Sequence, residues 1–291
     1  EQVLRQAAEA AGVPVLGALP RLDELAVPSR HLGLITAAEH GRHAQDAVDA
    51  MTDLIARHVE VAAVVALAGA RVDAAAWRPE AGEPVAGEPV VAVAAGKAFT
   101  FGYAEHTELL AAAGAQVVEF DPLTQPLPES AAALVLPGGF PEQYPAELAD
   151  NVPLRRGIAE LAQRGPIYAE CAGLTYLMTD LDGHPMCDVL HGSARFTQRL
   201  TLGYRDAVAV ADSVPYAAGD RVVGHEFHRT TVEFAHEYPP AWMYRLPGGA
   251  TARDGAVHAR VHASYLHTHP AATPLAVHRF VRATAGSRLA G

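Results

Sequence analysis

The sequence of 291 residues predicts an α/β fold built on a parallel sheet. Half of the residues are hydrophobic, which is enough for a sizeable core and for two domains. From residue 90 onward, short apolar runs alternate with helical stretches, a pattern typical of parallel strands joined by crossover helices. These segments are Val90–Ala94, Tyr103–Ala113, Gln116–Phe120, Ala132–Leu136, Pro153–Arg164 and Pro166–Glu170.

Further elements are expected toward the C-terminus. Ala207–Val210, Arg221–Gly224 and Val257–Tyr265 are strand candidates. Thr273 followed by Pro274 predicts the start of a closing helix, because proline is favoured at the first helical position.

Residues 1–72 are predicted to form a separate unit. Gln2–Ala11 has helical character and is followed by Gly12, a residue that ends helices at little cost. Val13–Leu19 is expected to be a short buried strand. Thr36 and Glu39 form a capping-box pattern, and apolar residues from Ala44 to Ile55 predict a long helix with one buried face.

Residues 73–89 are rich in proline, glycine and charge and show no periodicity, so they are predicted to be a linker between 1–72 and 90–291.

Charge and cysteine content exclude several classes of function. A net charge of −11 argues against nucleic acid or an anionic membrane surface as a partner. The longest strongly apolar stretch, Val59–Ala70, is too short to span a membrane. Two cysteines exclude a disulfide-dense scaffold, and no secretory signal begins the chain, so a soluble, cytoplasmic protein is expected.

Cys171 stands where an apolar run ends and a helix of small and apolar residues begins. This pattern predicts a nucleophile elbow, a sharp turn that projects the side chain from the sheet edge. The helix N-terminus is expected to favour the thiolate, and Gly173 leaves room for the turn. The alternative is a buried structural cysteine, since free cysteine behaves as a small hydrophobic residue.

Gly138 and Gly139 likewise follow an apolar run. Two glycines at a strand end allow backbone N–H groups to face a developing oxyanion, although many such pairs are only turns.

A thiol nucleophile normally needs a base, and histidine is the usual one. The sequence holds 15 histidines. Two groups stand out by their spacing, and any one member could instead be structural or part of a metal site. The groups are His262, His267 and His269, and His225 and His228.

Five motifs in order give the chain a specific resemblance. Together they look like the cobyrinate or hydrogenobyrinate a,c-diamide synthases, which are ATP- and glutamine-dependent amidases of cobalamin biosynthesis. The motifs are Val135–Glu142, Ile167–Leu174, Gly203–Arg205, Gly224–His228 and Ala263–His267. Val15–Arg21, Arg30–Leu34 and Ala38–Glu39 are similar to the end of that family's synthetase domain.

The resemblance implies a class I glutamine amidotransferase domain, of flavodoxin-like fold, at residues 90–291. Cys171 matches the nucleophile that attacks the glutamine amide, and His267 matches the base, with His269 as the competing assignment. Gly139 and the N–H of Ala172 would form the oxyanion hole. Many class I enzymes carry an acid two positions after the histidine; here that position is His269, so a Cys-His dyad is expected.

Other motif positions match without an assignable role. Tyr204, Arg205, Glu226 and His228 are expected to shape the face that meets the synthetase domain or the corrinoid.

The resemblance also implies ATP and Mg²⁺ for the full-length enzyme, with no cofactor bound by the amidotransferase domain itself. Family members place a P-loop near their N-terminus, yet no such motif occurs here; Gly96–Lys97 is the nearest match and is followed by Ala98. Residues 1–72 are therefore interpreted as the last third of a P-loop synthetase domain whose P-loop is absent.

The expected partners are glutamine and a corrinoid, either cobyrinic or hydrogenobyrinic acid, whose a- and c-carboxylates would be amidated. The oligomeric state, a homodimer included, stays open. The alternatives are a cobyric acid synthase, a non-catalytic module that kept the fold, and a thiol hydrolase with an acid between nucleophile and histidine in chain order.

Overall fold

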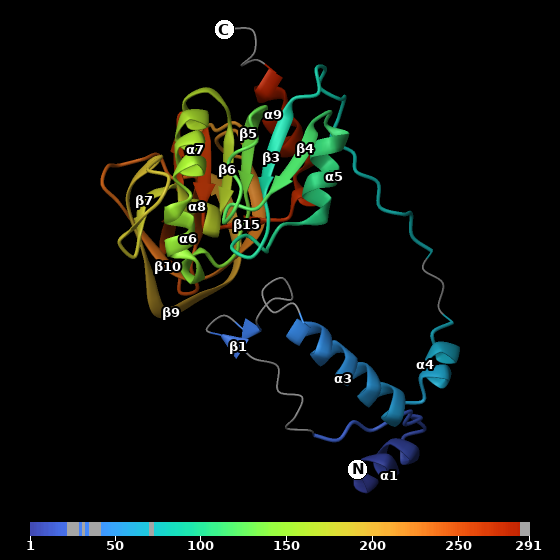
Figure 1. The fold of residues 1–291 in the computed structure, drawn as a ribbon. Helices are drawn as coiled ribbons and strands as arrows, with labels where there is room; N and C mark the ends of the chain where they lie inside the picture. The colour runs from blue at the N-terminus through green and yellow to red at the C-terminus, as the bar shows by residue number, and fades with distance from the viewer. Residues whose placement is uncertain (22–28, 31–32, 35–41, 70–72, 286–291) are drawn as a thin grey trace. The chain divides into compact units, whose positions relative to one another are not determined.

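The computed structural model describes residues 1–21, 29–30, 33–34, 42–69 and 73–285 (Figure 1). The chain divides into two compact units, Glu1–Trp77 and Arg78–Gly291. This division falls within the stretch 73–89 that the composition marked as a linker.

The first unit contains three helices among its described residues: α1 (Gln2–Ala10), α3 (Arg42–His58) and α4 (Val61–Leu67). Gly12 has φ +71°, the left-handed conformation expected after the first helix. The short strands β1 (Ser29–Arg30) and β2 (Gly33–Leu34) pair antiparallel. The capping box of Thr36 and Glu39, and the motif residues 31, 32, 38 and 39, lie outside the described residues.

Two expectations for this unit are wrong. Val13–Leu19 forms no buried strand: the segment makes one isolated bridge, between Gly17 and Val59, and Val13 and Leu19 are more than half exposed. Along α3, Leu54 is buried but Val48, Met51 and Ile55 are exposed. Apolar side chains are buried only where a second layer covers them, and the described part of this unit supplies none.

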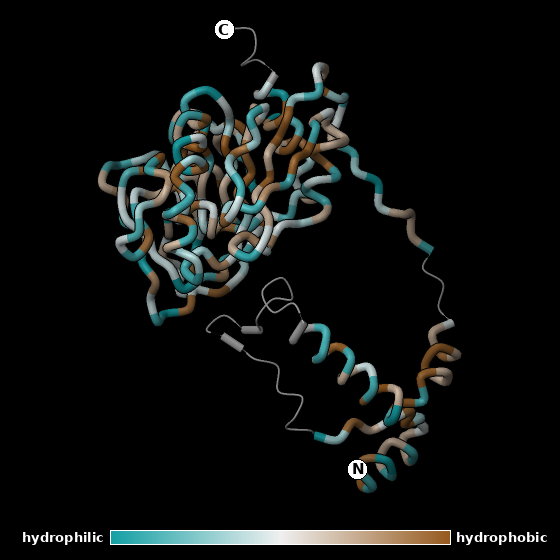
Figure 2. Tube along the Cα trace, in the orientation of Figure 1, coloured by the Kyte–Doolittle hydropathy of each residue, from teal (hydrophilic) through white to brown (hydrophobic). Residues whose placement is uncertain are grey.

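The apolar residues of α4 are also exposed. They form a hydrophobic stretch at the end of the unit in Figure 2, and Val65 and Leu67 have 67% and 66% of their surface exposed.

The second unit contains the predicted parallel sheet. Its strand order is β13-β14-β6-β5-β3-β4, with every neighbouring pair parallel except β13 and β14. The strands are β3 (Val90–Ala94), β4 (Gln116–Phe120), β5 (Ala131–Leu136), β6 (Ile167–Glu170), β13 (Ala256–His258) and β14 (Val261–Ser264).

Helices cover both faces of this sheet (Figure 1). Alternate residues of a strand point to opposite faces, so Val91 and Val93 of β3 pack in a core with α5 and α9, whereas Ala92 and Ala94 pack in a core with α6, α7 and α8. The helices are α5 (Ala104–Ala112), α6 (Pro145–Asp150), α7 (Val152–Arg164), α8 (Ala172–Leu177) and α9 (Pro274–Ala285), and the short 3₁₀ turns are Pro141–Gln143 and Pro270–Ala272.

A second sheet, antiparallel along its main path, was not predicted: only the ends of its two long strands have a recognisable strand pattern in the sequence. Its main path runs β12-β11-β9-β10-β15, and β7 and β8 join at the side. The strands are β7 (Met178–Leu181), β8 (His184–Pro185), β9 (Leu190–Ala209), β10 (Arg221–Phe234), β11 (Trp242–Arg245), β12 (Thr251–Asp254) and β15 (His267–Thr268). Because β15 follows β14 closely in the chain, this sheet meets the carboxyl end of the parallel sheet.

Among the described residues, no helix has both the length and the apolar character needed to cross a membrane.

Candidate active site

Cys171 occupies the turn between β6 and α8, as the nucleophile-elbow pattern predicts. Its backbone has φ +49° and ψ −98°, a conformation that residues with a side chain rarely adopt. The N–H of Cys171 donates a 2.7 Å hydrogen bond to the carbonyl of Ser264 in β14, which holds the turn against the sheet. A Cβ at Gly173 would lie 2.3 Å from the Leu136 carbonyl oxygen, so glycine lets α8 pack on β5.

The sulfur of Cys171 is buried, and this corrects the expectation of a thiolate. Burial raises the pKa of the thiol well above its ordinary value, and the nearby carboxylate of Glu142 raises it further, while the N–H of Ala172 acts in the opposite direction. Loss of hydration therefore outweighs the helix N-terminus. In this state the Cys171 side chain is a neutral thiol.

His267 lies on β15 and is 3% exposed. Its ring stacks on His225 of β10, with centroids 4.8 Å apart and planes 7° from parallel. Burial, together with the neighbouring His225 and His228, lowers the pKa of His267 to about 3. The imidazole is therefore neutral near pH 7, and the same burial makes its protonated form unfavourable.

Cys171 and His267 contact the same strand at positions two residues apart. The Cys171 sulfur lies 3.9 Å from the carbonyl oxygen of Phe227, and His267 stacks on and pairs with His225. The thiol and the imidazole therefore both lie against the same short stretch of β10.

His269, the competing base, lies in different surroundings. Its side chain is 45% exposed, its Nε2 is 4.0 Å from a carboxylate oxygen of Glu105, and its ring packs on Tyr103 with centroids 4.6 Å apart. Its Nδ1 accepts the N–H of Ala271. These contacts direct His269 toward the start of α5.

The two glycines after β5 have different neighbours. A Cβ at Gly138 would lie 2.3 Å from Cε1 of His267, whereas one at Gly139 would lie 2.1 Å from the Ala98 carbonyl oxygen. The carbonyl of Gly138 accepts the N–H of Phe101, which fixes the loop. Of the two expected oxyanion donors, the Ala172 N–H is already directed at the Cys171 sulfur, and Gly139 lies in the loop beside His267.

The remaining motif residues separate onto the two faces of the antiparallel sheet. Tyr204 is 86% exposed on one face. Arg205 and Glu226 form a buried ion pair at 2.5 Å on the other. His228 is buried beside them, with Nδ1 2.8 Å from the Thr230 carbonyl oxygen and its ring stacked on Tyr265 at 3.8 Å between centroids.

Glu226 and His228 line an open cavity of about 570 Å³ next to the elbow. Tyr265, which follows the Ser264 partner of Cys171, also lines it, as does Asp254. Asp254 is buried and accepts the N–H groups of Tyr265 and Leu266 at 3.0 Å each, while burial raises its pKa to about 6. No local pattern in the sequence points to Asp254, because its partners lie 11 and 12 positions away.

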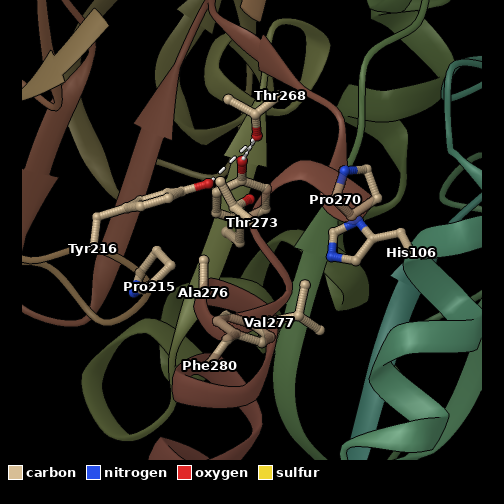
Figure 3. Close-up of a pocket in the computed structure, with 10 residues that line it drawn as sticks. His106, Pro215, Tyr216, Thr268, Pro270, Thr273, Ala276, Val277 and Phe280 are labelled. Carbon is tan, nitrogen blue, oxygen red and sulfur yellow. Dashed lines mark hydrogen bonds between the residues drawn. The ribbon is translucent and has the colours of Figure 1, made fainter. Parts of the chain in front are cut away.

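Glu170 is a second buried carboxylate that sequence reasoning missed. Its Oε1 accepts the Tyr168 hydroxyl at 2.7 Å, the Thr268 N–H at 2.9 Å and the Thr268 hydroxyl at 3.0 Å. Thr268 is also 3.4 Å from the hydroxyl of Tyr216 (Figure 3). Burial raises the pKa of Glu170 to about 7, against the effect of these hydrogen bonds. The one local signal for Glu170 is its place directly before Cys171.

The sequence raised the possibility of a metal site and of a phosphate-binding loop, and the described residues match neither. Within the part of the chain that the structure describes, no cluster of three histidine, cysteine or acidic side chains could hold a metal ion. The nearest match to a phosphate loop, Gly96–Ala98, does not fit ATP: a Cβ at Gly96 would lie 2.8 Å from the carboxyl carbon of Asp121, so a carboxylate already lies against the turn.

A parallel α/β sheet with a cysteine on a strained elbow, next to a second sheet that carries a buried neutral histidine, is an arrangement typical of thiol-dependent amidotransferase domains. Residues 90–274 match the model of the CobB/CobQ-like glutamine amidotransferase domain. The chain belongs to this family.

Curated relatives confirm the resemblance in the sequence. A hydrogenobyrinate a,c-diamide synthase of Mycobacterium tuberculosis is 63% identical over 284 residues, covering 97% of this chain and 62% of the relative. One from Streptomyces coelicolor is 49% identical, covering 97% and 65%. A cobyrinate a,c-diamide synthase of Synechococcus is 34% identical, covering 97% and 64%. The chain thus spans a little over three fifths of these relatives' length.

Among solved structures, a glutamine amidotransferase of Thermotoga maritima is 17% identical with a TM-score of 0.43, covering 62% of this chain and 76% of the other.

Proposed function

We propose that this chain releases ammonia from the side-chain amide of glutamine, with Cys171 as nucleophile and His267 as base. The observation that carries the proposal is the strained elbow of Cys171 in a chain of the glutamine amidotransferase family. Its sulfur contacts β10 at Phe227, two residues from the His225 on which the buried, neutral His267 stacks. His269 is the weaker candidate for the base, because it is half exposed and lies against Glu105.

In the first step the sulfur of Cys171 attacks the amide carbon of glutamine while His267 takes the thiol proton. The amide oxygen becomes an oxyanion, for which the N–H groups of Ala172 and Gly139 are the proposed donors. The tetrahedral intermediate collapses as His267 returns the proton to the nitrogen. Ammonia leaves and a thioester remains.

In the second step water attacks the thioester with His267 again acting as base. The carbon–sulfur bond breaks, the Cys171 thiol recovers its proton, and glutamate leaves. Every proton that His267 accepts is thus returned within the same half-reaction.

The two pKa shifts favour transfer of the thiol proton during the attack of the sulfur. They disfavour a thiolate–imidazolium ion pair in the resting state. Burial raises the pKa of Cys171 and lowers that of His267, so both directions keep the pair neutral. We therefore expect the proton to move only as the carbon–sulfur bond forms.

For the whole protein, we propose amidation of the a- and c-carboxylates of a corrinoid, either hydrogenobyrinic or cobyrinic acid, in the cytoplasm. The names of the relatives support this, and hydrogenobyrinate is favoured because the more similar relatives carry that name. ATP and Mg²⁺ would activate the carboxylates at a site outside the described residues of the amidotransferase domain. Residues 1–72 are proposed to belong to that synthetase part.

The test compares Cys171→Ser with Cys187→Ser in the full chain. Both cysteines are buried and free, so the pair is matched. Glutamine hydrolysis is expected to be lost in Cys171→Ser and kept in Cys187→Ser. With the synthetase part present, Cys171→Ser should still amidate the corrinoid from free ammonia.

Two results would contradict the proposal. Equal loss with glutamine and with ammonia would remove Cys171 from the glutaminase step. The absence of hydrolysis and of a trapped thioester in the wild type, with the synthetase part present, would favour a non-catalytic module. Competition between corrinoid substrates would separate the a,c-diamide reaction from a cobyric acid synthase.

A further inference from the structure

We propose that Glu170, the residue directly before the nucleophile, is the acidic positioning residue of the site, which holds His267 in the tautomer with its proton on Nδ1. This inference rests on the proposed function of Cys171 and His267. It replaces the expected Cys-His dyad by an arrangement of three residues, with the acid supplied by β6.

The usual source of the acid is absent from this sequence, because His269 stands two positions after His267. Other carboxylates near the elbow have different partners: Glu226 pairs with Arg205 at 2.5 Å, and Asp254 accepts two backbone N–H groups. Glu170, by contrast, has its Oε2 4.0 Å from Nδ1 of His267, with both side chains buried.

The two oxygens of Glu170 have different roles in this arrangement. Oε1 accepts three hydrogen bonds, two of them from Thr268. Because Thr268 follows His267 directly, these bonds tie the carboxylate to the backbone that carries the imidazole. The fixed Oε1 leaves Oε2 directed at Nδ1 of His267.

The ring of His267 is fixed from the other sides as well. His225 stacks on one face, and Gly138 lies against Cε1. The 4.0 Å separation exceeds a hydrogen bond, but catalytic hydrogen bonds are often long without substrate and tighten when it binds. A shift of about 1 Å would bring Nδ1 and Oε2 within hydrogen-bond distance.

The chemistry of the base requires a defined tautomer. A neutral imidazole carries its proton on one of two nitrogens, and only the Nδ1–H form leaves Nε2 free to take the thiol proton. A carboxylate facing Nδ1 selects this form and stabilises the imidazolium that arises during attack. The titratable groups facing the pair are Cys171 and Tyr168 around β6, His225 and His228 on β10, and Tyr103 and Tyr216.

A purely structural role for Glu170 is the alternative, since its hydrogen bonds also join β6 to β15. The two roles separate in the variant Glu170→Gln. The glutamine Oε1 can still accept from Thr268, but its NH₂ group would face Nδ1 and donate to it. That contact favours the opposite tautomer, with the proton on Nε2, where it blocks the base.

The experiment measures kcat and KM for glutamine and the tautomer of His267 by ¹⁵N NMR of the ¹⁵N-histidine-labelled full chain at pH 8. The His267 signals are assigned with His267→Gln. In the wild type we expect the Nδ1–H tautomer. In Glu170→Gln we expect the Nε2–H tautomer, and a kcat reduced by about 100-fold or more with KM changed less than about threefold.

Two further variants control for structure. Tyr168→Phe removes a donor to Oε1 but keeps the carboxylate, so it should retain the wild-type tautomer and lose only a few-fold in kcat. Glu170→Asp keeps the charge and should recover part of the activity lost in Glu170→Gln.

An Nε2–H tautomer in the wild type would overturn the proposal, even if Glu170→Gln failed to fold. So would equal losses of kcat in Glu170→Gln and Tyr168→Phe with an unchanged tautomer. Failure of the proposed function would give a different result, because the wild type would then show no Cys171-dependent turnover of glutamine. The His267 tautomer is measured without substrate, so it would still decide the role of Glu170.

Discussion

The imidazole ring of His225 lies flat against that of His267, with the planes 7° from parallel. His225 belongs to the long hairpin of the second sheet, and its register partner across β15 is His267 itself. The stack covers one face of the proposed base and contributes to the burial that keeps its pKa low. The antiparallel sheet therefore controls the protonation of a residue next to the parallel sheet.

His225→Ala is expected to move the titration profile of His267 upward in pH. Removing the ring exposes His267 to water, so its pKa rises from about 3 toward the ordinary value, and the base is lost at a higher pH. A shift of about one pH unit is the usual size for such a change. The measurement is the protonation of His267, read by ¹⁵N NMR of the ¹⁵N-histidine-labelled chain across roughly pH 2.5–8, a range that includes its pKa before and after the change.

Val223→Ala is the matched control, because Val223 lies two positions earlier on the same face of β10 and is 63% exposed. It should leave the profile unchanged. An identical profile in His225→Ala would show that the stack has no influence on the base.

Gly138→Ala should lower kcat by about 100-fold, the size of a lost base contribution. The new methyl group would lie 2.3 Å from Cε1 of His267, and the ring must move because backbone holds the glycine in place. Glutaminase kinetics and a melting curve together measure the effect.

Gly102→Ala provides the control in the same region, since its nearest neighbour would be a Pro137 carbon at 4.0 Å. Its kcat should stay close to that of the wild type. Normal turnover in Gly138→Ala would mean that the position of the His267 ring is not critical.

The parallel sheet could be predicted because its strands are apolar on both faces. All five residues of β3 are buried, and such runs are recognisable without knowledge of their partners. β9 and β10 have one exposed face, where Leu202, Tyr204 and Val223 lie, and polar residues interrupt the other. Their pairing depends on a long hairpin, which local sequence does not specify.

The residues of the candidate site also fall into two sets, those with a local sequence signal and those without one. Cys171 and His267 belong to motifs with local signals, a strand-to-helix turn and a histidine at the end of a strand. The contact of Glu170 with His267 joins residues 97 positions apart in the numbering, and that of Asp254 with the 265–266 segment depends on how β12 packs. Such contacts are set by the tertiary fold, so only the structure could reveal them.

Asp254→Ala is expected to destabilise the protein by about 3 kcal/mol, since two buried N–H groups lose a charged acceptor. These groups belong to Tyr265 and Leu266, directly before His267. Urea unfolding gives the free energy of unfolding.

The control for this change is Asp212→Ala, which removes one exposed hydrogen bond, from the N–H of Ala218. Its cost should stay below about 1 kcal/mol. Equal values for both variants would show that the carboxylate of Asp254 does not hold the 265–266 segment.

The last prediction concerns the pH dependence of stability. His262 is 1% exposed, and burial lowers its pKa to about 3. An unfolded histidine takes up a proton near pH 6.5, so between pH 6.5 and 3 the unfolded state binds more protons than the folded state. The contribution of His262 to stability is therefore complete above pH 6.5 and is lost as the pH falls.

Glu170 and Asp254 act with the opposite sign, because their folded pKa values, about 7 and about 6, are raised. Their folded forms bind protons more readily than the unfolded chain, so acid favours folding through these two groups. The wild-type curve alone mixes both effects. A comparison with His262→Phe isolates the histidine, because the carboxylates are common to both proteins.

His262→Phe keeps a ring that can stack on Tyr168, where the centroids are now 5.6 Å apart, but removes the titrating nitrogen and its contact with Ser213. Between pH 6.5 and 5, the stability of the wild type relative to this variant should fall by about 1.6 kcal/mol, because the unfolded histidine goes from half to almost fully protonated over that interval. Urea unfolding at several pH values measures the difference. A difference that stays constant with pH would mean that His262 becomes protonated inside the folded protein. The rings of Tyr168, Tyr216 and Trp242, which pack around His262, would then fail to exclude the charge.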